Sequence, residues 1–188
     1  MSDQARIFIG IELSGYFVDV IPMIKSTIID KKDSIRWING RNLHLTLSFI
    51  GSIDKTKLDM LEEKMSSISS FNSFDIIVNG TGTFPEAGSP KIFWLDIKKG
   101  SQTLLDLHSK INNISETFKQ NKKNEDFIPH ITIGRSKDFN KNLNFNLSIF
   151  SNAVYSDIKI PIKSICLFKS ELTEGGANYS VISKYLLK

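Results

Sequence analysis

The feature that most constrains this sequence is an internal repeat whose two copies each end in a histidine-containing strand. Each half contains an apolar stretch, a helical segment and a stretch that opens with His-x-Thr: IFIGIEL (7–13) and HLTL (44–47) in the first half, IFWLDIK (92–98) and HITI (130–133) in the second. The step from Ile7 to His44 is 37 positions (44 − 7), and that from Ile92 to His130 is 38 (130 − 92). This near match predicts two similar lobes around a pseudo-two-fold axis, with both His-x-Thr strands facing a cleft between them.

Apolar periodicity and turn-forming residues indicate the remaining elements. They predict helices over residues 15–30, 54–70 and 101–120, and strands over residues 6–13, 43–49, 74–79, 91–98, 130–135, 144–149, 160–169 and 179–187. Ser14 and Asp54 stand where the first two helices should begin, as candidate N-cap residues. Loops are expected at NGTGTFPEAGSP (79–90) and at the polar stretch 119–126, which precedes the second histidine motif.

Composition narrows the class of protein. A chain of 188 residues with 40% hydrophobic and 23% charged side chains is typical of an ordinary soluble domain, and no linker separates the halves, so residues 1–188 are expected to form one two-lobed domain. No apolar run approaches the roughly 20 residues of a membrane span, and no secretory signal is visible, so the expected compartment is the cytoplasm. A net charge of +4 gives weak support to an anionic partner.

The two His-x-Thr motifs are the candidate site. Side chains alternate between the faces of a strand, so His44 and Thr46 share one face, as do His130 and Thr132. One such tripeptide is a weak signal, because a histidine in a strand is usually structural. Two of the chain's three histidines in the same context, at equivalent places in a repeat, are poorly explained by chance.

Paired imidazoles suit phosphodiester chemistry. Opening a cyclic phosphate requires one proton to leave the attacking water and another to reach the departing oxygen on the opposite side of phosphorus. Histidine can do either near neutral pH, because its unperturbed pKa is about 6.5. The threonine hydroxyls could then bind the non-bridging phosphate oxygens. Arg135, five residues after His130, adds a fork of donors suited to phosphate, although a surface ion pair is its ordinary alternative.

Other uses of these residues are less favoured. A zinc site would need a third ligand, and no Cys, Asp or Glu recurs beside either histidine motif, so no metal or other cofactor is expected. Ser48 and the single Cys166 lack the context of an activated nucleophile. His108 is interpreted as a packing or surface residue. Phe8 is a tentative base-stacking residue, with core packing at least as favoured.

These motifs resemble a known family, the RNA 2′,3′-cyclic phosphodiesterases, also called 2′-5′ RNA ligases, of the two-histidine phosphoesterase superfamily. Five ordered blocks that span nearly the whole chain carry the resemblance: RIFIGIEL, RWINGRNLHLTLSFIGSID, GTFPEAGSPKIFWLDI, FIPHITIGR and SICLFKSELTEGGANYSVISKY. The resemblance implies an α+β fold of two lobes, with antiparallel sheets lining a central cleft and helices outside. It also implies metal-independent hydrolysis of a 2′,3′-cyclic phosphate to a 2′-phosphate.

The resemblance further implies individual roles. His44 would be the proton donor to the leaving 3′ oxygen and His130 the proton acceptor from water, while Thr46, Thr132 and Arg135 would hold the phosphate. The expected partners are RNA or nucleotides with 2′,3′-cyclic phosphate ends, with no membrane partner, and a monomer is the default expectation. Two alternatives stay open: an RNA- or nucleotide-binding module without turnover, and a sister activity that hydrolyses 2′-5′ linked oligonucleotides.

Overall fold

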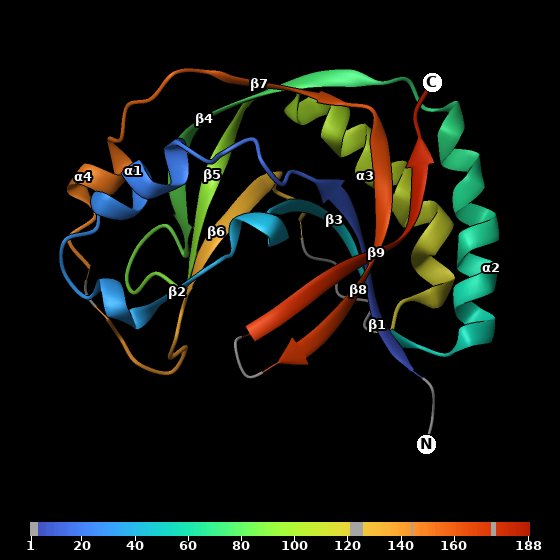
Figure 1. The fold of residues 1–188 in the computed structure, drawn as a ribbon, viewed down its shortest axis with the longest axis horizontal. Helices are drawn as coiled ribbons and strands as arrows, with labels where there is room; N and C mark the ends of the chain where they lie inside the picture. The colour runs from blue at the N-terminus through green and yellow to red at the C-terminus, as the bar shows by residue number, and fades with distance from the viewer. Residues whose placement is uncertain (1–3, 121–125, 144, 174–175) are drawn as a thin grey trace.

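Two antiparallel sheets form the framework of the protein. The computed structural model describes residues 4–120, 126–143, 145–173 and 176–188, with Lys32 described through its backbone only. The four-stranded sheet has the order β3 (His44–Ile53), β1 (Ala5–Glu12), β8 (Ser164–Thr173) and β9 (Gly176–Leu186) (Figure 1). The five-stranded sheet has the order β2 (Ile35–Trp37), β6 (His130–Ser136), β5 (Ile92–Lys99), β4 (Phe74–Phe84) and β7 (Ile158–Ile162). The expected α+β class, with one antiparallel sheet in each lobe, is confirmed.

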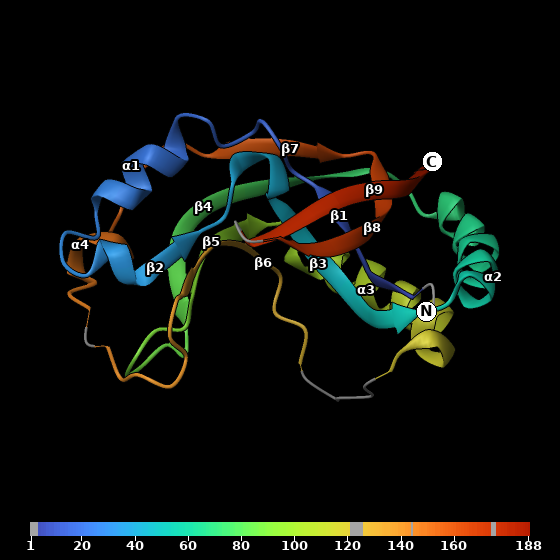
Figure 2. The ribbon, with the colours of Figure 1, turned by 60° about the horizontal axis from the view of Figure 1, so that its bottom comes forward.

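The helices lie at the two ends of the molecule, outside the sheets. Helices α2 (Lys55–Met65) and α3 (Ser101–Ser115) lie beside the four-stranded sheet, and α1 (Val20–Ser26) and α4 (Ser148–Ser151) lie beside the five-stranded sheet (Figures 1 and 2). Helix α3 packs on β3, although it connects β5 to β6. The halves of the chain are therefore interlocked. In the part of the chain described, no helix is long and apolar enough to cross a membrane.

Strand alternation directs apolar side chains from both sheets into one core. Ile9 and Leu45 of the first lobe and Leu95 and Ile131 of the second are all fully buried in the same cluster. Burial of this kind is the main stabilising contribution to folding. The core of the described residues is therefore continuous between the two lobes.

The first helix is shorter than predicted. Residues 15–30 were expected to be helical, but α1 begins only at Val20 because Gly15 has φ +88, a left-handed conformation that no α-helix contains. Asp19 occupies the N-cap, so Ser14 does not cap this helix. Asp54 caps α2 as expected, with its Oδ1 accepting a hydrogen bond from the Lys57 backbone N–H at 2.9 Å.

Strand boundaries differ from expectation at four places. The predicted loop 79–90 is partly strand, because an irregularity between Val78 and Thr81 lets β4 continue to Phe84. The described part of the predicted strand 144–149 is not a strand, and α4 begins there instead. The predicted strand 160–169 is divided at Lys163 into β7 and β8, and the short β2 was not anticipated. Residue 144 and residues 121–125 of the polar stretch 119–126 lie outside the described residues.

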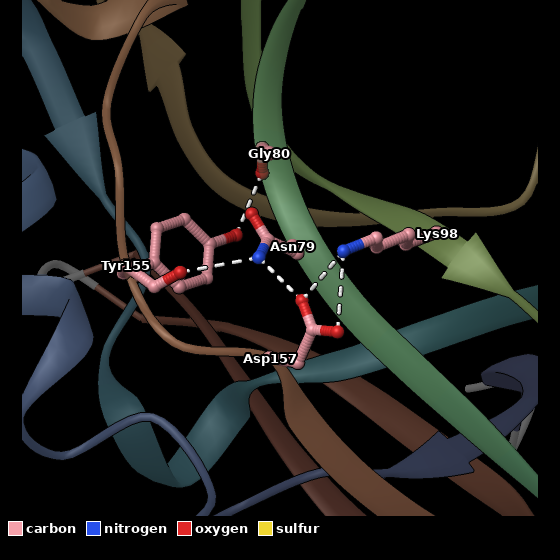
Figure 3. Close-up of polar contacts among 5 residues, drawn as sticks. All are labelled: Asn79, Gly80, Lys98, Tyr155 and Asp157. Carbon is pink, nitrogen blue, oxygen red and sulfur yellow. Dashed lines mark hydrogen bonds and ion pairs between the residues drawn. The ribbon is translucent and has the colours of Figure 1, made fainter.

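A polar cluster ties the segment before β7 to the irregular part of β4. Figure 3 shows Asn79 donating from Nδ2 to Asp157 Oδ1 at 2.6 Å and to the Tyr155 carbonyl at 3.1 Å. The Tyr155 hydroxyl donates to the Gly80 carbonyl at 2.7 Å, and Lys98 pairs with Asp157 at 3.0 Å. Burial raises the pKa of Tyr155, so its hydroxyl stays protonated and continues to donate.

We predict that Asn79→Ala lowers the free energy of unfolding by about 1–2 kcal/mol, because it removes a donor shared by two acceptors, one of them a charged carboxylate. Urea denaturation followed by circular dichroism measures this change. Asn113→Ala, at an exposed position of α3, is the matched control and should be neutral or slightly stabilising. Equal stability of the two variants would show that the cluster contributes nothing.

Candidate active site

The two histidine motifs face a common cleft, as the repeat predicted. Strands β3 and β6 contact each other where the two sheets meet. Two hollows adjoin there: one of about 490 Å³ that contains His44, and one of about 560 Å³ that contains His130, Thr46 and Thr132. Arg135 lines both hollows. The structure therefore brings all five predicted catalytic and phosphate-binding residues to one place.

Both imidazoles are held in the same way. His44 Nδ1 lies 2.6 Å from the Asn42 carbonyl oxygen, and His130 Nδ1 lies 2.7 Å from the Ile128 carbonyl oxygen. A carbonyl can only accept a hydrogen bond, so the hydrogen is assigned to Nδ1 in both neutral rings. In each ring, Nε2 is then the nitrogen that can exchange a proton with a ligand. The shared arrangement gives the cleft two equivalent imidazoles.

A β-bulge in each motif turns a further side chain toward the cleft. Gly10 pairs with Thr46, but the preceding Ile9 pairs with Ser48, so Leu47 is an extra residue in β3. The alternation restarts after this bulge, and Phe49 shares the cleft face with His44 and Thr46. In a strand without the bulge, residues an odd number of positions apart lie on opposite faces. Phe49 follows His44 by five residues, so it would then have pointed toward the core.

Strand β6 repeats this irregularity. Trp94 pairs with Thr132 and Phe93 with Gly134, which leaves Ile133 as the extra residue. Arg135 therefore points to the cleft, although it also lies at an odd offset from its histidine. Arg135 and Phe49 occupy equivalent positions, five residues after their histidines, and both line both hollows.

A hydrogen bond from another segment satisfies the carbonyl of each bulged residue. His108 Nδ1 lies 2.7 Å from the Leu47 oxygen, and the Ile38 backbone N–H donates to the Ile133 oxygen at 2.9 Å. A buried carbonyl without a partner would cost free energy, so these donors stabilise the bulges. His108 is thus more than the packing or surface residue that the sequence indicated, because it supports the first motif from α3.

Aromatic rings surround His44. Phe8 lies 4.8 Å from the His44 ring, centroid to centroid, and is stacked on Phe168 at 4.8 Å with an interplanar angle of 6°. Tyr179 meets His44 edge to face at 5.0 Å. Only 3% of Phe8 is exposed, against 62% of Phe49, so Phe8 supports the histidine and Phe49 is the ring more open to a ligand.

The repeat as read from the sequence matches Ile7 with Ile92 and hence Phe8 with Phe93, and this alignment is wrong by one position. The bulges pair Ile9 with Ser48 and Phe93 with Gly134, so Ile9 is the equivalent of Phe93. Phe93 is fully buried in the main core, whereas Phe8 lies on the cleft side. Matching the Ile-Phe pairs at 7–8 and 92–93 therefore aligned the two strands one residue out of register.

Burial and positive charge set the protonation of the site. Burial lowers the pKa of His44 to about 4, with further lowering by the charges of Arg135 and His130. Burial and Arg135 also lower the pKa of His130. Both rings are therefore neutral at pH 7 in the free protein. No carboxylate in the described part of the chain pairs with Arg135, whose guanidinium stays charged despite its burial, so the site favours an anion.

Several lining residues were not found from the sequence, among them three aromatic residues and a lysine. Phe49 and Tyr179 line the first hollow, and Lys119 and Phe127 line the second. Of these residues, only Phe49 could have been found from the sequence. It follows His44 by the same number of positions as Arg135 follows His130. Within the described residues, His, Cys, Asp and Glu form no group of three or more that could hold a metal ion. Ser48 and Cys166 are buried.

We predict that His44→Gln reduces the loss of stability in acid. His44 has a pKa of about 4 when folded and about 6.5 when unfolded, so the unfolded state binds the extra proton between these values. Stability is therefore lost as the pH falls from 6.5 to 4, by roughly 3 kcal/mol for this residue. Denaturation at pH 7 and pH 4 measures the loss in both proteins. An equal loss in the variant would contradict burial of a neutral His44.

Comparison with known proteins places the chain in a family. The model of the 2′-5′ RNA ligase superfamily matches residues 30–174. The chain is similar to a protein named RNA 2′,3′-cyclic phosphodiesterase from Aquifex aeolicus (strain VF5), with 29% identity over 187 residues and 97% coverage of both chains. It is also similar to a protein of the same name from Archaeoglobus fulgidus, with 28% identity over 178 residues and 93% and 96% coverage.

Solved structures share the fold. A protein from Thermus thermophilus superposes with a TM-score of 0.78 at 21% identity over 97% of both chains. Escherichia coli LigT complexed with NADP+ gives 0.76 at 19% identity, over 98% of this chain and 99% of that one. The family model includes both His-x-Thr motifs and most of the chain, and the protein belongs to the 2′-5′ RNA ligase superfamily.

Proposed function

We propose that this protein hydrolyses the 2′,3′-cyclic phosphate at the end of an RNA to a 2′-phosphate, using its two histidines and no metal. The observation that carries the proposal is the pair of equivalently held imidazoles beside Arg135, a cation without a carboxylate partner among the described residues. The names of the relatives support the cyclic phosphate as substrate. The positive charge of Arg135 favours an anion beside the two imidazoles.

In the proposed reaction, water attacks phosphorus as the bond to the 3′ oxygen breaks. His130 Nε2 takes a proton from the water, and protonated His44 gives one to the departing 3′ oxygen, so the product is a 2′-phosphate with a free 3′ hydroxyl. Thr46, Thr132 and Arg135 bind the non-bridging oxygens, where charge develops in the transition state. The assignment of acid to His44 and base to His130 rests on the family resemblance, because the two imidazoles are held alike.

Substrate binding allows His44 to take up from solvent the proton that it later donates. Both imidazoles have a lowered pKa in the free protein, but a phosphate monoanion between them raises both pKa values by stabilising the imidazolium. The effect is larger for His44, which is more deeply buried and so less screened by water. The anion therefore helps to charge the histidine that acts as the acid.

The same site could accept a 5′ hydroxyl in place of water. The bond to the 3′ oxygen would break as before, and the product would be a 2′-5′ linkage, so ligation and its reversal need no new catalytic group. A 2′-5′ oligonucleotide phosphodiesterase is the corresponding alternative. A binding module without turnover is a further alternative, which two free Nε2 atoms make less favoured.

We predict that the wild-type protein converts a 2′,3′-cyclic mononucleotide to the 2′-phosphate in the presence of excess EDTA. His44→Gln and His130→Gln should each lower kcat by roughly 10²–10⁴, because each removes a general acid or base. Chromatography of the products separates the 2′- from the 3′-phosphate, and Asn113→Ala controls for nonspecific effects. Full turnover by either histidine variant, or loss of activity with chelator, would refute the proposal.

The pH dependence gives a separate prediction. The rate kcat/KM reports the free protein, in which one imidazole must be charged and the other neutral. The pKa of each ring is lowered from 6.5, that of His44 to about 4, so kcat/KM should be highest below pH 6.5 and fall above it. The maximum for kcat should lie at higher pH, because bound substrate raises both pKa values. A kcat/KM that continues to rise above pH 7.5 would contradict this assignment.

A further inference from the structure

The hollow around His130 is much larger than its proposed chemistry requires. A water molecule in position for attack needs about 30 Å³. The hollow has a volume of about 560 Å³, within the range of sites that hold drug-sized ligands. In the proposed function, the terminal nucleoside can occupy the separate hollow of about 490 Å³ around His44, which Arg135 also lines. The hollow around His130 therefore has room for a further ligand besides the attacking water.

Aromatic rings line this second hollow. His108 and Phe127 are stacked with their centroids 4.1 Å apart and an interplanar angle of 9°. The Nδ1 of His108 is held by the Leu47 carbonyl, so the ring on which Phe127 stacks is oriented before any ligand binds. Phe84 meets His130 edge to face at 5.1 Å, and Phe49 stands between the hollows. Preformed aromatic platforms are the usual means of binding single-stranded nucleic acid.

Charge in the same hollow favours a phosphate. Lys119 is half-buried and forms a hydrogen bond with Asn112 Oδ1. Burial lowers its pKa and the charge of Glu116 raises it to a smaller extent, but no carboxylate within the described ranges lies close enough to form an ion pair with it. Asp126 also lines the hollow, but it is exposed. A partly desolvated ammonium beside aromatic rings matches a nucleotide better than it matches water or an apolar ligand.

We propose that the hollow around His130 binds a second nucleoside, with its base against the His108–Phe127 ring pair and its phosphate toward Lys119. This inference rests on the proposed function, which places the reacting phosphate at Arg135, between the hollows. The second nucleoside has two possible sources. It either precedes the terminal residue in the same strand or belongs to a second strand that presents its 5′ oxygen to phosphorus.

Binding to Phe127→Leu tests the site without turnover. This change keeps an apolar side chain and removes the ring. The probes are a 3′-5′ linked dinucleotide with a 2′-phosphate end, a 2′-5′ linked dinucleoside monophosphate, and a mononucleotide 2′-phosphate, each titrated by calorimetry. We expect Phe127→Leu to weaken one dinucleotide about tenfold relative to the mononucleotide. Phe139→Leu, at a ring that is 51% exposed and lines neither hollow, should leave this ratio unchanged.

The outcome identifies the source and separates the two proposals. Weakening of the 3′-5′ linked probe indicates the preceding nucleoside, and weakening of the 2′-5′ linked probe indicates the second strand. If Phe127→Leu alters neither ratio while the wild-type protein hydrolyses the cyclic mononucleotide, the second subsite is refuted and the proposed function stands. If binding is weakened but the wild-type protein has no hydrolytic activity, the subsite stands and the proposed function fails.

Discussion

The paired bulges in β3 and β6 are the constraint on which the site depends. Without the extra residue, Phe49 and Arg135 would point into the core, which has no place for a guanidinium. A bulge leaves a carbonyl that the regular ladder does not satisfy, and here His108 and the Ile38 backbone N–H bind those carbonyls. The catalytic face is therefore set by hydrogen bonds from outside the two strands as much as by the strands themselves.

The electrostatics of the site favour a bound anion. Without an anion, protonation of the two histidines at low pH is unfavourable. Arg135 lies between the hollows without a carboxylate partner in the described ranges, and it lowers the pKa of both histidines. A phosphate reverses this effect, because it neutralises the guanidinium and stabilises an imidazolium. In the proposed reaction, binding and activation are thus coupled through one cation, and the interlocked helices hold the two lobes around it.

Much of the fold followed from local patterns. Strands with strongly apolar sequences, such as β1 and β6, and the capped helix α2 were predicted near their observed bounds. The predicted boundaries were wrong where a single residue or a bulge overrides the local pattern of apolar residues. Because Gly15 has a left-handed conformation, the first helix begins later in the chain than predicted. Strand β4 continues through a glycine-rich stretch whose sequence is typical of a loop. The segment that leads into α4 alternates apolar and polar residues as a strand would, yet its described part forms no strand and α4 begins at Ser148.

The sequence by itself determined the two His-x-Thr motifs and their equivalence in a repeat, and it predicted the residues that we propose bind phosphate, because these depend only on residue type and spacing. The tertiary structure alone decided what surrounds them. It showed that His108 of α3 supports β3 and that Phe127 and Lys119 line the hollow of His130. Such contacts join segments distant in the chain, and the bulges that change strand register leave no local signature from which they could be read.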